Sequence, residues 1–127
     1  MLTVLNIAQT PDSPGILFDK DKNVFEISGR SLPENTGKFY EPIIQWLEEY
    51  VKAPNSETVV TFKFDYFNSS TAKKIVEMIS LLEKIRESSK AAKVIWCYGE
   101  GDELIKNRGE ELKELSDVPF ELVVVSS

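Results

Sequence analysis

The residues of this chain that could do chemistry are concentrated in one polar run, Asn68-Ser69-Ser70-Thr71. Apolar and polar residues alternate before it, from Val60 to Tyr66, and apolar residues recur at helical spacing from Ala72 onward. The hydroxyl groups are therefore predicted at a junction between a strand and a helix. The first-turn N–H groups of a helix lack partners, so this place favours negative charge.

Two interpretations of the junction are compatible with its residues. In the simpler one, Ser69 or Ser70 caps the helix, which is worth about 1 kcal/mol. In the other, the site sometimes holds an anion, because Lys73 and Lys74 are predicted in the first turn, where the helix dipole disfavours cations. A phosphoserine would supply that anion, with a charge of about −1.5 to −2.

Histidine is absent from the chain. This excludes Ser-His-Asp and Cys-His nucleophiles and zinc sites built on histidine. The single cysteine, Cys97, excludes an internal disulfide and is predicted to be an inert buried thiol. Gly99-Glu100-Gly101 lacks the third glycine of a dinucleotide-binding fingerprint, since Leu104 takes that place. We therefore expect neither a metal nor another cofactor.

Carboxylates could still support catalysis. Asp65, Asp102 and Glu103 could do acid–base work if the fold brought them together in a pocket. The simpler interpretation is that they lie on solvated surfaces. A small carboxylate-dependent enzyme therefore stays as an alternative of another class.

Length and charge set further bounds. At 127 residues the chain is predicted to form one domain, residues 1–127. Fifteen basic against 21 acidic residues give a net charge of −6, which argues against nucleic acids and anionic membranes as partners. Neither a signal peptide nor a membrane-spanning apolar stretch is recognisable, so we expect a cytoplasmic protein without membrane insertion.

The elements that must position the junction can be predicted from periodicity. Residues 16–18 and 24–27 are expected to pair as a β-hairpin, and residues 29–35 to form a loop that ends at a helix capped by Asn35 or Thr36. The apolar run at residues 94–98 is typical of a strand covered on both faces. Strands then alternate with helices, which predicts an α/β fold: a mixed sheet with an N-terminal antiparallel hairpin and three main helices.

Two polar segments have a distinctive spacing, Ser31-Leu32-Pro33-Glu34-Asn35 and Tyr66-Phe67-Asn68-Ser69-Ser70. They are accompanied, in chain order, by Gly29-Arg30, Phe39-Tyr40, Trp46-Leu47 and Trp96-Cys97-Tyr98. Taken together, these segments resemble the SiaC family of bacterial regulatory phosphoproteins over nearly the whole chain.

The resemblance implies a STAS-like fold, similar to that of anti-sigma-factor antagonists. It also implies that Ser69 is phosphorylated by a dedicated protein kinase and dephosphorylated by a PP2C-type phosphatase. The unphosphorylated form of such a protein binds an effector, in the best-known case a diguanylate cyclase that it activates. This sequence has serine where the family is known to have threonine, and Thr71 is a nearby second hydroxyl.

Our hypothesis is that phosphorylation of Ser69 blocks the docking of an effector at this junction. The residues expected to contact that partner are Asn68, Ser70, Thr71, Lys73 and Lys74. A STAS-type antagonist that binds an anti-sigma kinase is the alternative within the same fold. It would use the same phosphorylation site and a different partner.

Overall fold

Strands and helices follow one another in the order that the sequence predicts. The computed structural model describes residues 2–126. Its elements are β1 (Leu5–Ile7), β2 (Gly15–Asp19), β3 (Val24–Ser31), α1 (Thr36–Tyr50), β4 (Glu57–Phe67), α2 (Ser69–Glu87), β5 (Ala91–Gly99), α3 (Glu103–Leu115) and β6 (Phe120–Val125). The predicted α/β class is confirmed.

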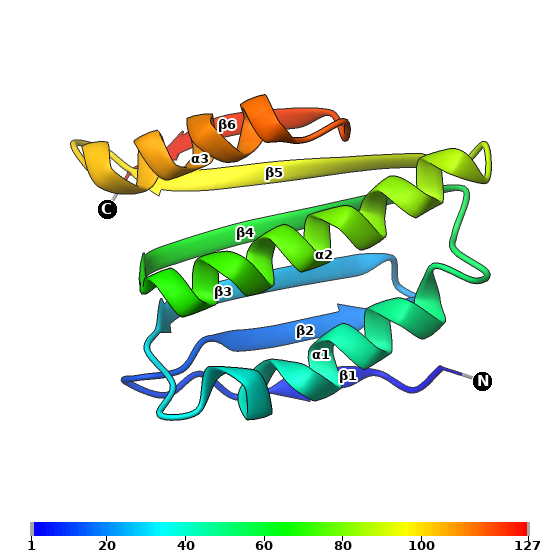
Figure 1. Cartoon of the computed structure of the whole chain (residues 1–127), viewed down its shortest axis with the longest axis horizontal. Coiled ribbons are helices and arrows are strands. Elements are labelled where there is room, and N and C mark those ends of the chain that lie inside the picture. The colour runs from blue at the N-terminus through cyan, green and yellow to red at the C-terminus, as the bar shows by residue number, and fades with distance from the viewer. Residues whose placement is uncertain (1, 127) are drawn as a thin grey trace.

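The strands form one mixed sheet whose spatial order equals their chain order, β1 to β6 (Figure 1). β1, β2 and β3 pair antiparallel, and the hairpin of β2 and β3 places Ile16 opposite Ile27. β3, β4, β5 and β6 pair parallel, because each of the three helices returns the chain to the end where the next strand begins. The N-terminal antiparallel hairpin and the three main helices are as predicted.

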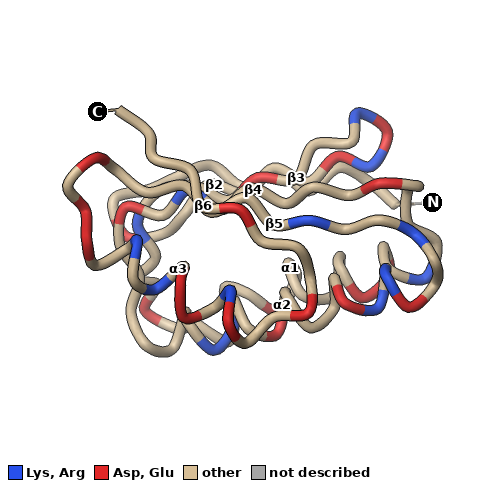
Figure 2. The backbone as a smooth tube through the Cα atoms, turned by 90° about the horizontal axis from the view of Figure 1, so that it is seen from above, with Lys and Arg blue, Asp and Glu red and all other residues tan. Residues whose placement is uncertain are grey.

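All three helices pack on one face of the sheet (Figure 2). The prediction that residues 94–98 are covered on both faces is therefore wrong. Trp96 points into the helix-covered core and is fully buried, whereas Ile95 on the opposite face is only partly buried. Ile95 lies between Thr61 and Glu121 on the neighbouring strands, so the uncovered face is polar beside it although these strands pair parallel.

β3 is longer than predicted, since Gly29, Arg30 and Ser31 belong to the strand and not to a loop. The register against β4 shifts between Gly29 and Arg30, which forms a β-bulge. Gly29 has a φ of +106°, and a Cβ there would lie 2.6 Å from Cδ of Gln9. The glycine thus permits the bulge that brings Ser31 beside the end of β4.

Two groups of aromatic side chains fill the space between sheet and helices. Under α1, Phe18 and Phe25 contact Trp46, and Trp46 stacks on Tyr50 with ring centroids 5.4 Å apart. Under α2 and α3, Trp96 contacts a second set, which comprises Phe62, Phe64, Phe67 and Phe120. These rings hold the helices at fixed positions above the sheet.

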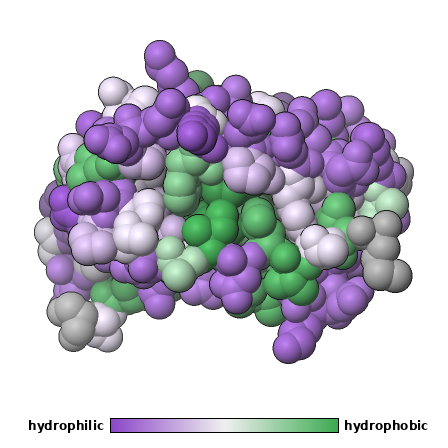
Figure 3. Space-filling model, turned by 90° about the horizontal axis from the view of Figure 1, so that it is seen from below, coloured by the Kyte–Doolittle hydropathy of each residue, from purple (hydrophilic) through white to green (hydrophobic). Residues whose placement is uncertain are grey.

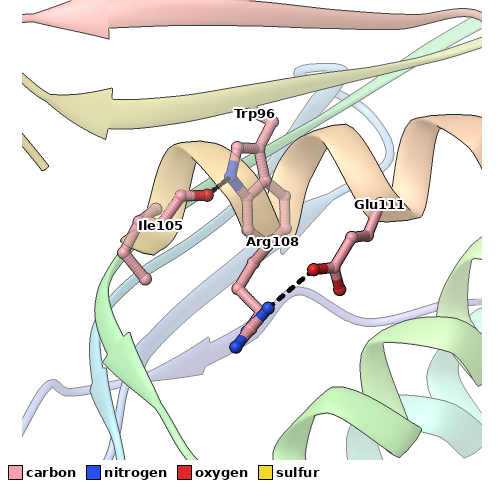
Figure 4. A network of polar contacts seen from close by, with 4 residues as sticks. All are labelled: Trp96, Ile105, Arg108 and Glu111. Atoms are coloured by element: carbon pink, nitrogen blue, oxygen red, sulfur yellow. Dashed lines mark hydrogen bonds and ion pairs between the residues drawn. The ribbon is translucent and has the colours of Figure 1, made fainter. Parts of the chain in front are cut away.

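Trp96 also fixes α3. Its indole Nε1 donates a hydrogen bond of 2.9 Å to the carbonyl of Ile105 (Figure 4). A Cβ at Gly109 would lie 2.3 Å from Cδ1 of Trp96, so only glycine lets the helix approach the ring this closely. On the solvent side of the same helix, Arg108 pairs with Glu111 at 2.8 Å.

Apolar surface gathers along the side of the molecule formed by β1 and α1 (Figure 3). Val4 is 52% exposed there, and Leu2, Leu5 and Ile7 are partly buried against the core.

Among residues 2–126, no helix is both long and apolar enough to span a membrane.

Replacing Gly109 by alanine should destabilise the fold. The added methyl group would collide with Trp96, and overpacking of this kind costs about 1–3 kcal/mol. The matched control is Gly37→Ala in α1, where the nearest atom is 3.8 Å away and alanine should be neutral or stabilising by about 0.4–1 kcal/mol. Denaturant unfolding of both variants measures the difference, and equal midpoints would contradict the packing argument.

Candidate functional site

Three helices begin at the same edge of the sheet (Figure 1). β3, β4 and β5 end there, at Ser31, Phe67 and Gly99, because parallel strands share their carboxyl-terminal edge. The loops that follow lead into α1, α2 and α3. The predicted junction at residues 68–71 therefore lies between the starts of two other helices.

The first layer of this edge is a buried cluster of hydroxyl groups, contributed by Ser31, Tyr40 and Thr71. All three side chains are fully buried. Ser31 Oγ lies 2.7 Å from the Tyr40 hydroxyl and 2.9 Å from Thr71 Oγ1, and the Thr71 hydroxyl lies 3.3 Å from the Ser31 carbonyl. These contacts join β3, α1 and α2 directly beneath the junction.

Burial also changes the chemistry of Tyr40. It raises the pKa of this phenol from 10.0 to about 12, although the hydrogen bonds with the neighbouring hydroxyls act in the opposite direction. Tyr40 is therefore neutral at physiological pH. The cluster is an uncharged structural contact.

The second layer is exposed and begins with Asn68, which caps α2. Its Oδ1 accepts hydrogen bonds from the backbone N–H of Thr71 at 2.9 Å and from the hydroxyl of Ser70 at 3.1 Å. The prediction that Ser69 or Ser70 caps the helix is therefore wrong by one or two positions. An asparagine amide oxygen reaches the third N–H of the helix as well as a serine does, so residue type alone could not place the cap.

The three hydroxyl residues of the junction have different environments. Ser70 Oγ lies 3.0 Å from Thr36 Oγ1 at the start of α1. Thr71 is fully buried, so neither a kinase nor a partner can reach its side chain without opening the fold. Ser69 is exposed, and its hydroxyl makes no hydrogen bond within residues 2–126. Ser69 is thus the most accessible hydroxyl of the run.

Both lysines lie one turn later than predicted. α2 begins at Ser69, which places Lys73 and Lys74 in the second turn. Lys74 forms an ion pair of 3.2 Å with Glu77, whereas Lys73 is exposed. The charge of Lys74 is thus accounted for without an anion, and the argument from misplaced cations is weaker than the sequence indicated.

Ser31, Thr36 and Tyr40 are site residues that reasoning from periodicity missed. They lie in the first of the two polar segments and just after it, and the structure joins that segment to the second through the contacts at Ser70 and Thr71. A signal for this contact was available in the sequence. Strands that follow one another through a helix are usually neighbours in the sheet, so the loops after them are expected to lie side by side.

Of the three predicted carboxylates, Asp102 and Glu103 are adjacent at the start of α3, whereas Asp65 lies in β4. Asp102 caps α3 by accepting a hydrogen bond of 3.1 Å from the N–H of Ile105. Asp65 is the extra residue of the bulge in β4 and is exposed. No group of three or more His, Cys, Asp or Glu residues within residues 2–126 is placed to hold a metal ion. Cys97 is buried, as predicted, and burial raises the pKa of its thiol.

Comparisons with known proteins agree with this architecture. The family model for SiaC family regulatory phosphoproteins matches residues 7–125. An uncharacterized protein of Pseudomonas aeruginosa (strain UCBPP-PA14) is 25% identical over 116 residues, which cover 91% of this chain and 92% of that protein.

Solved structures show the same fold. SiaC of Pseudomonas aeruginosa superposes with a TM-score of 0.88 at 23% identity, over 97% of this chain and 99% of that chain. The crystal structure of the diguanylate cyclase SiaD in complex with its activator SiaC, also from Pseudomonas aeruginosa, matches with a TM-score of 0.88 at 24% identity. That match covers 95% of this chain and 99% of the other.

Replacing Thr71 by valine should destabilise the protein more than replacing Ser70 by alanine. Valine keeps the shape of Thr71 but removes a buried hydroxyl bonded to Ser31, which we expect to cost about 1–3 kcal/mol. Ser70 is exposed, and the loss of its contacts should cost less than about 1 kcal/mol. Denaturant unfolding compares the two variants, and a larger loss in Ser70→Ala would contradict the assignment of the buried layer.

Proposed function

Because the chain belongs to the SiaC family of regulatory phosphoproteins, we propose that it is a protein-binding switch set by phosphorylation of Ser69. A partner kinase adds the phosphate and a PP2C-type phosphatase removes it. The unphosphorylated form binds an effector protein, and residues 1–127 act as one SiaC-type domain without catalytic activity or a cofactor of their own.

The observation that carries this proposal is the exposure of Ser69 at the start of α2. A kinase needs a hydroxyl that can enter its active site. Ser69 offers one that makes no hydrogen bond within residues 2–126, whereas Ser70 contacts Asn68 and Thr36 and Thr71 is buried. Accessibility therefore favours Ser69 over its two neighbours.

The helix N-terminus tolerates the added charge. A phosphoserine brings a charge of about −1.5 to −2. Next to the free N–H groups of the first turn, such an anion should stabilise the helix by roughly 0.3–1 kcal/mol. Phosphorylation is thus expected to leave the fold intact.

The switch then acts in the complex. Burial of a charged group in an interface without a matching cation costs several kcal/mol. Each 1.4 kcal/mol changes the affinity about tenfold. A phosphate on Ser69 would therefore weaken the docking of any effector that covers the start of α2. Asn68 and Ser70 are accessible there, and Lys73 and Lys74 lie in the second turn of the helix.

We propose a diguanylate cyclase as the effector. The support is the structure of the similar SiaC protein, which is in complex with the diguanylate cyclase SiaD as its activator. We also propose that the protein acts in the cytoplasm, where a kinase, a phosphatase and a cyclase could all reach the same surface.

Mapping of the modified residue tests the proposed acceptor. Protein isolated from its native cells should carry a phosphate, and Ser69→Ala should abolish it while Ser70→Ala retains it. Of the three hydroxyl residues of the junction, Ser69 is the one that is exposed and makes no side-chain hydrogen bond within residues 2–126. Intact-mass and peptide mass spectrometry give the result. Phosphate on Ser70 or Thr71 in the unsubstituted protein would overturn the choice of Ser69.

Substitution of Ser69 by aspartate should weaken binding to the candidate cyclase at least about tenfold. The matched control is Ser69→Asn, which has nearly the size of aspartate without its charge and should bind like the unsubstituted protein. Isothermal titration calorimetry measures all three affinities.

Equal affinities for the aspartate variant and the unsubstituted protein would refute the switch. Equal losses in both variants would show that size and not charge is responsible. Binding to an anti-sigma kinase in place of a cyclase would support the antagonist alternative.

A further inference from the structure

β6 forms one edge of the sheet and pairs with β5 on one side only (Figure 1). The carbonyls of Pro119 and Val125 accept hydrogen bonds from Val94 and Glu100, which belong to β5 and the loop after it. Backbone groups point to alternate sides along a strand, so the odd-numbered residues of β6 face β5. The residues whose N–H and C=O groups point to the free edge are Phe120, Leu122 and Val124.

This edge lacks several of the features that normally prevent strands from pairing. Natural edge strands are protected by lysine, proline, a bulge or very short length. β6 contains neither lysine nor proline, and its register with β5 is regular from Phe120 to Val125. Its one charged residue, Glu121, is paired with Lys93 at 2.6 Å within the same sheet.

The opposite edge of the sheet differs in each of these respects. β1 has three residues, against six in β6. Next to β1, the carbonyl of Thr3 accepts a hydrogen bond of 2.7 Å from the indole of Trp46. β6 is therefore the edge that offers a long and regular row of backbone groups.

We propose that β6 pairs antiparallel with β6 of a second copy of this chain, around a two-fold axis at Val123. This interaction goes beyond the proposed switch and is independent of it. In this register Leu122 lies opposite Val124 of the second copy. Both residues direct their backbone groups outward, so they can exchange N–H to C=O hydrogen bonds as an antiparallel pair requires.

The sequence of β6 suits pairing with itself. The proposed register keeps the helices of both copies on the same side of one continuous sheet. Val124, which is 54% exposed, would be covered by Leu122 of the second copy. Glu121 would lie opposite Val125 and not opposite its own counterpart, so no like charges face each other across the axis.

Charge gives this dimer a recognisable salt dependence. Each chain has a net charge of −6, so the two copies repel each other. Salt screens this repulsion beyond about 10 Å at 0.1 M ionic strength. The dimer should therefore become tighter as salt increases, while contacts that rest on opposite charges would become weaker.

The oligomeric state of the full chain tests the proposal. We expect the mass in sedimentation equilibrium to rise from monomer to dimer between micromolar and millimolar protein. Val124→Pro removes an outward N–H that the chain's own sheet does not use, and should weaken dimerisation at least about tenfold. Val124→Thr keeps that donor with a similar shape and should dimerise as before. Circular dichroism and denaturant unfolding verify that both variants are folded.

A second pair of variants covers the case in which the proline disturbs folding. Val123→Lys would place two like charges on the axis and weaken the dimer, whereas Val123→Thr should not. A monomer at every concentration would overturn the proposal. So would a dimer that neither Val124→Pro nor Val123→Lys weakens, because its interface would lie elsewhere.

Discussion

The hydroxyl of Ser31 is the contact on which the proposed site depends. It joins the end of β3 to α1 through Tyr40, at 2.7 Å, and to α2 through Thr71, at 2.9 Å. Because Thr71 is held inside, the rotation of α2 about its axis is fixed. Successive helical residues are about 100° apart, so Ser69 points away from the side on which Thr71 is buried. One buried side chain thus determines which hydroxyl solvent and other proteins can reach.

The same contact bears on how the proposed phosphorylation could act without changing the fold. The buried hydroxyls are satisfied by one another, and no buried polar side-chain atom within residues 2–126 lacks a hydrogen-bond partner. A phosphate on Ser69 would meet free N–H groups at the surface and would leave this layer undisturbed. Under the proposed function, the consequence of phosphorylation is therefore confined to the surface that an effector covers.

The sequence predicted the order of strands and helices because their periodicities are clear. For the cap of α1 it left Asn35 and Thr36 open, and the structure places the cap at Asn35. The sequence misplaced the cap of α2, since asparagine and serine are equally good caps. It also did not predict the burial of Thr71. That burial depends on Ser31, 40 residues earlier in the chain, and local patterns carry no information about such a contact. The resemblance to the SiaC family marked both segments as distinctive without showing that they touch.

Hydrogen exchange of the chain with and without the cyclase tests most directly whether this edge is the docking surface. The amides of Ser69 and Ser70 have no intrahelical partner and should exchange rapidly in the free protein. We expect the complex to slow exchange in peptides that cover residues 31–38 and 66–74. Unchanged exchange in those peptides, with protection elsewhere on the domain, would contradict the account.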